Sequence, residues 1–374
     1  MRATGQTHAV IAGSLGKGNL GDEALLQAFL GRHWHDYDVR SVVADGARAA
    51  PGPEVQVVPV PAFALGRRFW RGFLERRGAA RAIVGRAPHA VRELVWLGGL
   101  LGPDEPHTRR RLHELRWALG FCERPVYYFG DAADRFDAAP SAAALVRLLD
   151  RSGAFVAVRS SEAAAALSAA GLRAPIQVGV DPVLYDRAAQ RPPPFARTQP
   201  PGDAMAIVPC VYHRERWQET WLAAARSAAH HGLTICWVSF SDDEDLALCH
   251  ELADAVRREH PHLPQEVGPS HVAETHIARA ACCVATRYHA AIYALTDGVP
   301  VIGIAYDVKI ARLLRLLGLA ECAVEDPHAG RERIVEQVAH AIGAAWSPDY
   351  TGLVEQLAAH TRALEALTGA GDGH

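Results

Sequence analysis

Short apolar segments alternate with helical segments along most of the chain, and few folds accommodate such a pattern. In the first half, residues 8–14 and 38–45 are typical of β-strands, while residues 22–34 and 160–171 are typical of helices. Strand, helix and strand in succession indicate a parallel sheet with helices on both faces. Gly171 ends one helical segment, as a C-terminal capping glycine does. The sequence therefore predicts an α/β fold.

A proline-rich segment interrupts this alternation. It runs from Arg187 to Asp203 and reads RAAQRPPPFARTQPPGD, in which the prolines favour neither strand ladders nor helices. The alternation then resumes, which predicts a second sheet with crossover helices. Two Rossmann-like lobes of this kind resemble the GT-B architecture, with the active site in the interlobe cleft. The predicted divisions are an N-terminal lobe at residues 1–190, a linker at 191–203, a C-terminal lobe at 204–345, and a C-terminal helix and tail at 346–374.

Charge and hydropathy exclude several classes of protein. The 374 residues carry 39 Lys and Arg against 42 Asp and Glu, which removes the usual electrostatic basis for binding nucleic acid. No uncharged apolar stretch approaches the roughly 18 residues that a transmembrane helix needs. The seven cysteines form no Cys-x-x-Cys pair, and most of them lie in apolar segments. Reduced, buried thiols in a cytoplasmic protein are the interpretation we adopt.

The first glycine-rich turn, GSLGKGNLGDEALL, lies between a predicted strand and a predicted helix at Gly13–Leu26. Its glycines allow backbone N–H groups to approach an anion at the positive end of the helix. We predict that Asn19 and Gly21 bind substrate here. Asp22 has two interpretations, as the N-cap of a helix that begins at Glu23 or as a ligand contact.

Basic side chains follow strands at several later turns. Arg159 ends one predicted strand, and Ser160 or Ser161 caps the next helix. Arg287 and His289 lie between a strand and a helix, and Lys309 occupies the corresponding place one unit later, after Tyr306 and Asp307. Because strand carboxyl ends face the ligand crevice in such sheets, we expect Arg287, His289 and Lys309 to form an anion-binding pocket.

Three segments carry a family resemblance. GNLGDEALL, VRSSEAAAAL with the later VGVDP, and RYHAAIYALTDGVPVIGIAYDVKI resemble the signature segments of the polysaccharide pyruvyl transferase family. The resemblance implies a GT-B-like fold, phosphoenolpyruvate as donor, and a sugar or glycan acceptor whose hydroxyl pair forms a pyruvyl ketal. It further implies that Arg159, Arg287 and His289 bind the donor and that Lys309 is the basic residue of the last motif.

Two stretches of the first lobe depart from the family pattern. Leu97–Glu105 reads LGGLLGPDE and lacks one glycine and a polar residue of the expected stretch, and DAADRF replaces a glycine-rich turn after PVYYFG. The acceptor is expected on this lobe, and it is a glycan, a lipid-linked precursor or a sugar-bearing small molecule. The resemblance therefore describes the donor half better than the acceptor half.

The chemistry suggests roles for two side chains. We hypothesise that His289 is the general acid or orients the donor phosphate, because imidazole titrates near neutral pH. Asp22 is a candidate base or acceptor-orienting group. The alternatives are a GT-B glycosyltransferase that uses a nucleotide sugar, with Glu274 near the ribose, and a non-catalytic phosphate-ligand binding protein. The oligomeric state stays open.

Other clusters have weaker interpretations. The histidines lack metal-ligand spacing, so we predict a metal-independent protein that needs no cofactor besides its donor substrate. Residues 242–245 form an acidic helix start that complements the helix macrodipole. The basic, aromatic run Arg67–Arg77 predicts an amphipathic surface helix, with docking of an acidic or lipid-linked substrate as the alternative.

Overall fold

A computed structural model gives the architecture of the protein as two compact units. The first unit comprises Met1–Lys17, Asp22–Asp186 and Gln356–His374, and the second comprises Gly18–Gly21 and Arg187–Glu355. The predicted helix at Arg67–Arg77 lies outside the described residues. The structure describes residues 8–13, 15, 18–33, 38–44, 56–59, 92–99, 109, 112, 113, 115, 116, 119, 122, 124–130, 140–197, 201–212, 214–343 and 346–368.

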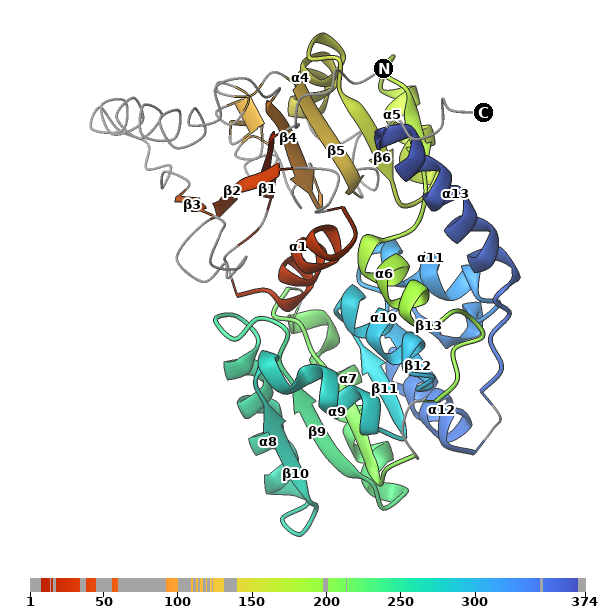
Figure 1. Cartoon of the computed structure of the whole chain (residues 1–374). Coiled ribbons are helices and arrows are strands. Elements are labelled where there is room, and N and C mark those ends of the chain that lie inside the picture. The colour runs from red at the N-terminus through yellow and green to blue at the C-terminus, as the bar shows by residue number, and fades with distance from the viewer. Residues whose placement is uncertain are drawn as a thin grey trace, which may run out of the picture. The chain divides into compact units, whose positions relative to one another are not determined.

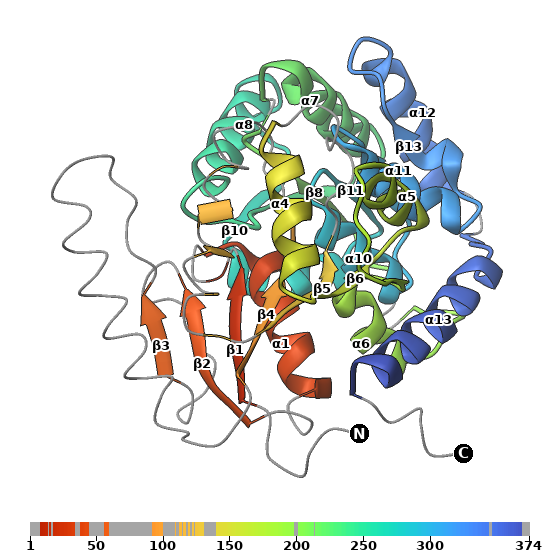
Figure 2. The same ribbon diagram turned by 90° about the horizontal axis from the view of Figure 1, so that it is seen from above.

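The first unit contains a parallel sheet of seven strands among its described residues, in the order β3-β2-β1-β4-β5-β6-β7. Figure 2 shows β3, β2 and β1 side by side. The first six of these strands follow the Rossmann order, and β7 adds one further strand at the edge. The order in which successive strands are added to the sheet reverses between β1 and β4, although all strands remain parallel. The strands are β1 His8–Gly13, β2 Asp38–Ala44, β3 Gln56–Pro59, β4 Arg92–Leu97, β5 Arg124–Gly130, β6 Phe155–Val158 and β7 Ile176–Val178.

Helices of the first unit bury apolar faces on this sheet. Leu145 and Leu149 of one helix pack with Val156 and Val158 of β6 in a single core. The described helices are α1 Leu20–His33, α4 Pro140–Arg151, α5 Ser161–Ala169 and α6 Pro182–Gln190, together with the later part of α13 Thr351–Thr368.

Local signals in the sequence fix the ends of α5. The Ser160 hydroxyl accepts a hydrogen bond from the Ala163 N–H at 3.1 Å, which identifies Ser160 as the N-cap. Gly171, after the helix, has a φ of +87°, a left-handed conformation that glycine adopts without strain. Both predictions for this helix are confirmed.

The second unit repeats the architecture. Its parallel sheet has the order β10-β9-β8-β11-β12-β13, so the order again reverses, here between β8 and β11 (Figure 1). The predicted GT-B-like pair of Rossmann-like lobes is thus present in the topology of the units. The strands are β8 Ala204–Val208, β9 Thr234–Val238, β10 Gln265–Gly268, β11 Cys282–Ala285, β12 Val301–Ile304 and β13 Ala323–Val324.

Alternate residues of the second sheet face different helices. Ile235 and Trp237 of β9 share a core with residues of α7, α8 and α12. Gly303 of β12 faces the opposite side, where a Cβ would lie 2.2 Å from Cγ2 of Ile310 in α11. The helices are α7 Arg214–His230, α8 Leu246–Glu259, α9 Ala273–Arg279, α10 Tyr288–Thr296, α11 Val308–Leu316 and α12 Gly330–Gly343.

Helix α6 reaches further into the proline-rich segment than the prolines suggest. It continues through Arg187 to Gln190, the residue before the predicted linker. The Arg187 guanidinium donates to the Asp297 carboxylate at 3.0 and 3.1 Å and to the Thr296 hydroxyl at 2.6 Å. Since Asp297 is buried, this pairing holds the last turn of α6 in place.

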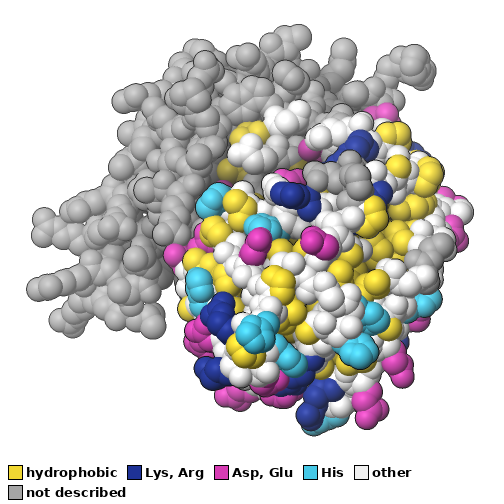
Figure 3. All heavy atoms as spheres, turned by 90° about the horizontal axis from the view of Figure 1, so that it is seen from below, with side chains coloured by type: hydrophobic (Ala, Val, Ile, Leu, Met, Phe, Trp, Pro, Cys, Tyr) yellow, Lys and Arg dark blue, Asp and Glu magenta, His cyan; other side chains and the backbone are white. Residues whose placement is uncertain are grey.

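Exposed charges of both signs are interspersed on the face shown in Figure 3, where the described Lys and Arg side chains lie among Asp, Glu and His side chains. This distribution agrees with the nearly balanced composition. None of the described helices is both long enough and apolar enough to cross a membrane.

The seven cysteines are all described, and all are free thiols; six are buried and Cys122 is partly exposed. Burial raises the pKa of Cys210, Cys236 and Cys282 to about 12. Since these pKa values lie above those of the unfolded chain, the thiols stabilise the fold at neutral pH. That contribution is lost as the pH rises towards 12.

We predict that the folded protein resists thiol modification. An aromatic disulfide reagent at pH 8 should react rapidly with at most one thiol, that of Cys122, because the other six are buried and protonated. In denaturant all seven should react. Cys122→Ser should remove the fast phase, and rapid reaction of several thiols in the folded protein would contradict the burial.

Candidate active site

The predicted donor residues of the second unit lie where its strand order reverses. Arg287 is the N-cap residue of α10, two residues after the end of β11, and His289 lies in the first turn of that helix. Tyr212 follows the neighbouring strand β8. In open parallel sheets, ligands bind outside the carboxyl ends of the strands at this reversal. The prediction that these two residues lie where a strand ends and a helix opens is confirmed: Arg287 lies between β11 and α10, and His289 lies in the first turn of α10.

Arg287 is held by two carboxylates. Its Nε donates to Asp245 Oδ2 at 2.9 Å, and its Nη2 donates to Asp245 Oδ1 at 2.7 Å and to Glu244 Oε2 at 3.1 Å. The side chain of Asp245 is 0% exposed and that of Arg287 is 9% exposed. The Arg287 Nη1 makes no hydrogen bond to a residue that the structure describes. The guanidinium is therefore fixed along one edge.

Charges around Arg287 are unevenly distributed. Burial lowers the pKa of Arg287, but nearby acidic groups raise it by more, so its pKa lies above the usual value. Among these groups the Cys210 thiol is protonated at neutral pH, because burial raises its pKa to about 12. Asp245 and Glu244 thus supply the negative charge that keeps Arg287 ionised.

The Tyr212 ring lies against the face of the Arg287 guanidinium. The centre of the Arg287 guanidinium lies 5.2 Å from the Tyr212 ring centroid, and the Tyr212 hydroxyl donates to Glu244 at 3.0 Å. Burial and the Glu244 carboxylate raise the pKa of Tyr212 to about 12. A neutral phenol therefore lies on the guanidinium face at physiological pH.

The glycine-rich turn of the N-terminal segment contributes to the second unit. The Leu20 N–H donates to the Phe240 carbonyl at 2.8 Å, and Asn19 forms an antiparallel bridge with Ser241. The Asn19 side chain accepts from the Gly21 N–H at 3.0 Å, one residue after α1 begins. Asn19 is thus the N-cap of α1, and the N-cap interpretation of Asp22 is wrong because the helix begins earlier.

Gly21 lies directly against His289. A Cβ at Gly21 would be 2.2 Å from His289 Nδ1 and 3.0 Å from its Cγ, closer than side-chain atoms approach. Only glycine leaves room for the imidazole in this position. The structure therefore brings together Gly21 and His289, two predicted site residues from segments far apart in the chain.

Lys309 lies in the first turn of α11, beside the acidic N-cap of that helix. The Asp307 side chain accepts from the Lys309 backbone N–H at 3.0 Å, so Asp307 is the N-cap. The Lys309 Nζ lies 3.4 Å from Asp307 Oδ2, and the Lys309 side chain is 33% exposed. Lys309 thus remains accessible to solvent while its position is restrained.

In the first unit, two motif segments contact each other. Arg159, after β6, donates from Nη1 to Asp181 Oδ2 at 2.7 Å, and the Asp181 side chain is 0% exposed. Asp181 Oδ1 accepts from the Val183 N–H at 2.9 Å and so caps α6. Asp181 belongs to the VGVDP segment, which explains why an acidic residue and a proline occur together there.

Asp22 lies near the carboxyl end of β4 in the same unit. A Cβ built on Gly98, the residue after β4, would be 3.9 Å from Asp22 Oδ1. Gly98 has a φ of +82° and begins the departing stretch Leu97–Glu105, of which residues 97–99 are described. The position of Asp22 is compatible with either a base or an acceptor-orienting group.

The carboxylates that hold Arg287 are not recognisable from the sequence alone. Residues 242–245 are predicted only as an acidic helix start, whereas Asp245 makes no side-chain capping hydrogen bond to α8 and pairs with Arg287 instead. Asp242 accepts from the Ser270 N–H and hydroxyl at 2.7 and 2.9 Å. The macrodipole interpretation is incomplete, because these contacts join residues that are distant in the sequence.

A sequence model of one family matches most of the chain. That model, described as polysaccharide pyruvyl transferase, covers residues 19–308. The chain belongs to the polysaccharide pyruvyl transferase family. The family is one of transferases, and the match includes every predicted site residue except Lys309, which lies one residue beyond it.

Solved structures with a similar fold include nucleotide-sugar enzymes. The UDP-N-acetylglucosamine 2-epimerase from Rickettsia bellii is 10% identical, with 98% of each chain covered and a TM-score of 0.61. The Methanocaldococcus jannaschii UDP-GlcNAc 2-epimerase, in complex with UDP-GlcNAc and UDP, is 11% identical, with 96% of this chain and 100% of the other covered and a TM-score of 0.57. Anabaena HepE, in complex with UDP and glucose, is 13% identical, with 96% and 99% covered and a TM-score of 0.55.

These similarities confirm the predicted GT-B-like fold of this member of the pyruvyl transferase family. Because the sequence identities are so low, the similarities show the fold alone. No curated protein matches the chain in sequence.

We predict that Asp245→Asn destabilises the protein. The substitution keeps the shape of the side chain but leaves the buried Arg287 guanidinium with only the partly exposed Glu244 as a charged partner. The free energy of unfolding, measured by urea denaturation, should fall by about 3 kcal/mol. The control Asp243→Asn, at an exposed neighbouring position, should change it by less than about 0.5 kcal/mol. Equal effects of the two variants would contradict the role of Asp245.

We also predict opposite effects of two glycine substitutions in α1. Gly21→Ala should displace the His289 imidazole and lower the free energy of unfolding by about 1 kcal/mol or more. Gly31→Ala meets nothing within 4 Å and should raise it by up to about 1 kcal/mol. The His289 ring resonances in the NMR spectrum, assigned with His289→Gln, should shift in Gly21→Ala alone. Unchanged resonances there would contradict the contact.

Proposed function

We propose that the protein transfers a pyruvyl group from phosphoenolpyruvate to two hydroxyls of a sugar or glycan, with release of phosphate. The observation that carries this proposal is the fixed guanidinium of Arg287 beside His289 at the strand-order reversal of a family member. Reversals of this kind bind ligands in many parallel sheets.

Phosphoenolpyruvate carries a carboxylate and a phosphate on one carbon, so its site requires several donors directed at anionic oxygens. Arg287 has Nη1 available on the edge away from Asp245. The positive end of α10 also favours an anion here, and its N-cap residue Arg287 makes no side-chain capping hydrogen bond. Lys309 of the same unit would supply a further positive charge.

The proposed reaction begins with proton transfer from His289 to the methylene carbon of the donor. This step leaves an oxocarbenium-like centre at the neighbouring carbon, which an acceptor hydroxyl attacks, and the proton of that hydroxyl replaces the proton that His289 lost. The C–O bond to phosphate then breaks, and a second hydroxyl closes the ketal as its proton passes to the departing phosphate. Packing against Gly21 supports this role, because it restricts the imidazole to one orientation.

For the acceptor, the proposed residue is Asp22, which belongs to the first unit. Asp22 would deprotonate or orient an acceptor hydroxyl near the end of β4. We propose a glycan, a lipid-linked precursor or a small sugar conjugate as acceptor, with no cofactor besides the donor. Free, buried thiols support a cytoplasmic location.

We predict that two substitutions impair donor chemistry in different ways. His289→Gln should lower the rate of phosphate release from phosphoenolpyruvate by about 100-fold or more, because it removes the proton donor. Arg287→Lys should mainly raise KM for phosphoenolpyruvate, by about tenfold, because it replaces a bidentate fork by a point charge. Arg315→Lys, at a half-exposed position of α11, is the matched control and should leave both quantities unchanged.

Turnover close to that of the unsubstituted protein in both folded variants would reject the assignment. A thermal-shift titration separates the alternatives: phosphoenolpyruvate should stabilise the protein, and UDP and GDP sugars should not. Stabilisation by the nucleotide sugars alone would favour a glycosyltransferase. Glu274, the candidate ribose ligand for that reaction, pairs with Arg187 in the structure.

A further inference from the structure

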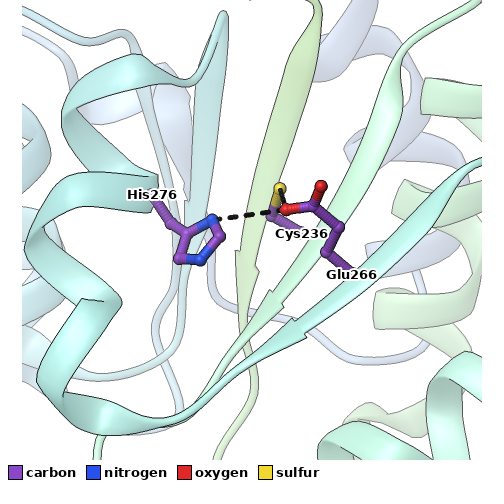
Figure 4. A group of neighbouring side chains, drawn as sticks. All are labelled: Cys236, Glu266 and His276. Atoms are coloured by element: carbon purple, nitrogen blue, oxygen red, sulfur yellow. Dashed lines mark hydrogen bonds and ion pairs between the residues drawn. The ribbon is translucent and has the colours of Figure 1, made fainter.

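Three potential metal ligands meet on one face of the second sheet. They are Cys236 of β9, Glu266 of β10 and His276 of α9, drawn in Figure 4. Cys236 Sγ lies 3.9 Å from Glu266 Oε2, and His276 Nδ1 lies 3.8 Å from the same oxygen. All three ligand atoms lie within 4.8 Å of one another.

Sheet geometry explains how the group forms. Cys236 and Glu266 are register partners on adjacent parallel strands, so their side chains project from the same face. Ile235 and Trp237, which flank Cys236, face the opposite core. Helix α9 covers the face that carries Cys236 and brings His276 over it, as Figure 4 shows.

Gly268 provides the space for the imidazole. A Cβ at this position, two residues after Glu266 on β10, would lie 3.0 Å from both Cδ2 and Nε2 of His276. Any larger residue would push the ring away from the sheet. The glycine and the three ligand residues therefore act together to place Nδ1 beside the thiol and the carboxylate.

We propose that Cys236, Glu266 and His276 form a binding site for a zinc ion, with a water molecule in the fourth position. Sulfur, nitrogen and oxygen donors together suit Zn²⁺, whereas Mg²⁺ and Ca²⁺ require oxygen ligands. Tetrahedral zinc places its ligand atoms roughly 3.3–3.6 Å apart. The observed separations of 3.8 and 3.9 Å from Glu266 Oε2 would contract by a few tenths of an ångström on zinc binding. The separation of Cys236 Sγ from His276 Nδ1, which is at most 4.8 Å, would contract by up to about 1.2 Å.

Charge balance supports the same ion. Zinc binding displaces the thiol proton to solvent as the S–Zn bond forms, which leaves a thiolate, a carboxylate and a neutral imidazole around a divalent cation. The sum of these charges is zero. A neutral complex suits this site because Cys236 is only 5% exposed, and an uncompensated charge there would be costly. The Glu266 side chain, at 62% exposed, connects the site to solvent.

The site is distinct from the donor residues. Cys236 and Glu266 lie within their strands, whereas Arg287 and His289 follow the carboxyl end of β11. A bound ion would connect the edge strand β10 and helix α9 to β9 through Glu266, His276 and Cys236, and so stabilise the packing of these three elements. Zinc binding would therefore stabilise the second unit, independently of pyruvyl transfer.

The test is a metal titration of the full chain after removal of metal with a chelator and excess thiol reductant. We expect one equivalent of Zn²⁺ by calorimetry, a rise in Tm with zinc, and a thiolate-to-metal charge-transfer band when Co²⁺ replaces zinc. His276→Gln and Glu266→Gln should each weaken zinc binding at least about tenfold. Cys236→Ala should in addition abolish the charge-transfer band.

His271→Gln is the matched control, because His271 is exposed and lies five residues before His276. It should bind zinc as the unsubstituted chain does. Because Cys236 is buried, Cys236→Ala could fail to fold. The test then depends on His276→Gln and Glu266→Gln, which change less buried side chains. Zinc affinity unchanged in His276→Gln and Glu266→Gln, or lost equally in His271→Gln, would overturn the proposal and leave a hydrogen-bonded ion pair at this place.

Discussion

The pair formed by Arg287 and Asp245 determines the arrangement of the candidate site. A buried guanidinium is tolerated only if a carboxylate neutralises it, and Asp245 does so with two hydrogen bonds. Asp245 also accepts from the Val211 N–H at 3.1 Å, so the carboxylate connects the residues that follow β8 to the N-terminus of α10. One interaction therefore fixes both the orientation of the cation and the relation between two chain segments at the reversal.

The strand order explains why this constraint belongs at this place. Both units have a point at which the strand order reverses, and in open parallel sheets ligands bind outside the carboxyl ends of the strands at such a point. In the second unit the residues at this point are Cys210, Tyr212, Arg287 and His289, with the segment Gly18–Gly21 added. The backbone thus supplies the position, while the side chains supply the charge.

Much of the fold is predictable from the sequence, and the contacts between distant segments are not. The two alternations, the caps at Ser160 and Gly171, and the strand-to-helix positions of Arg159, Arg287 and His289 follow from local periodicity. The partners Asp245 and Asp181 lie 42 and 22 residues from their arginines, and no local rule relates them. The grouping of Cys236, Glu266 and His276 likewise depends on strand register and on the placement of α9.

The carboxylates around Arg287 have a consequence for the proposed donor. Asp245 and Glu244 together outweigh the single charge of Arg287, so this cluster alone would repel a multiply charged anion. Tight donor binding would therefore require the α10 N-terminus and Lys309 in addition. The same balance would limit the affinity for product phosphate, which lacks the carboxylate. Because Asp245 and Glu244 already neutralise Arg287, its guanidinium can orient a bound anion without holding the product phosphate tightly. A transferase that releases phosphate requires weak product binding of this kind.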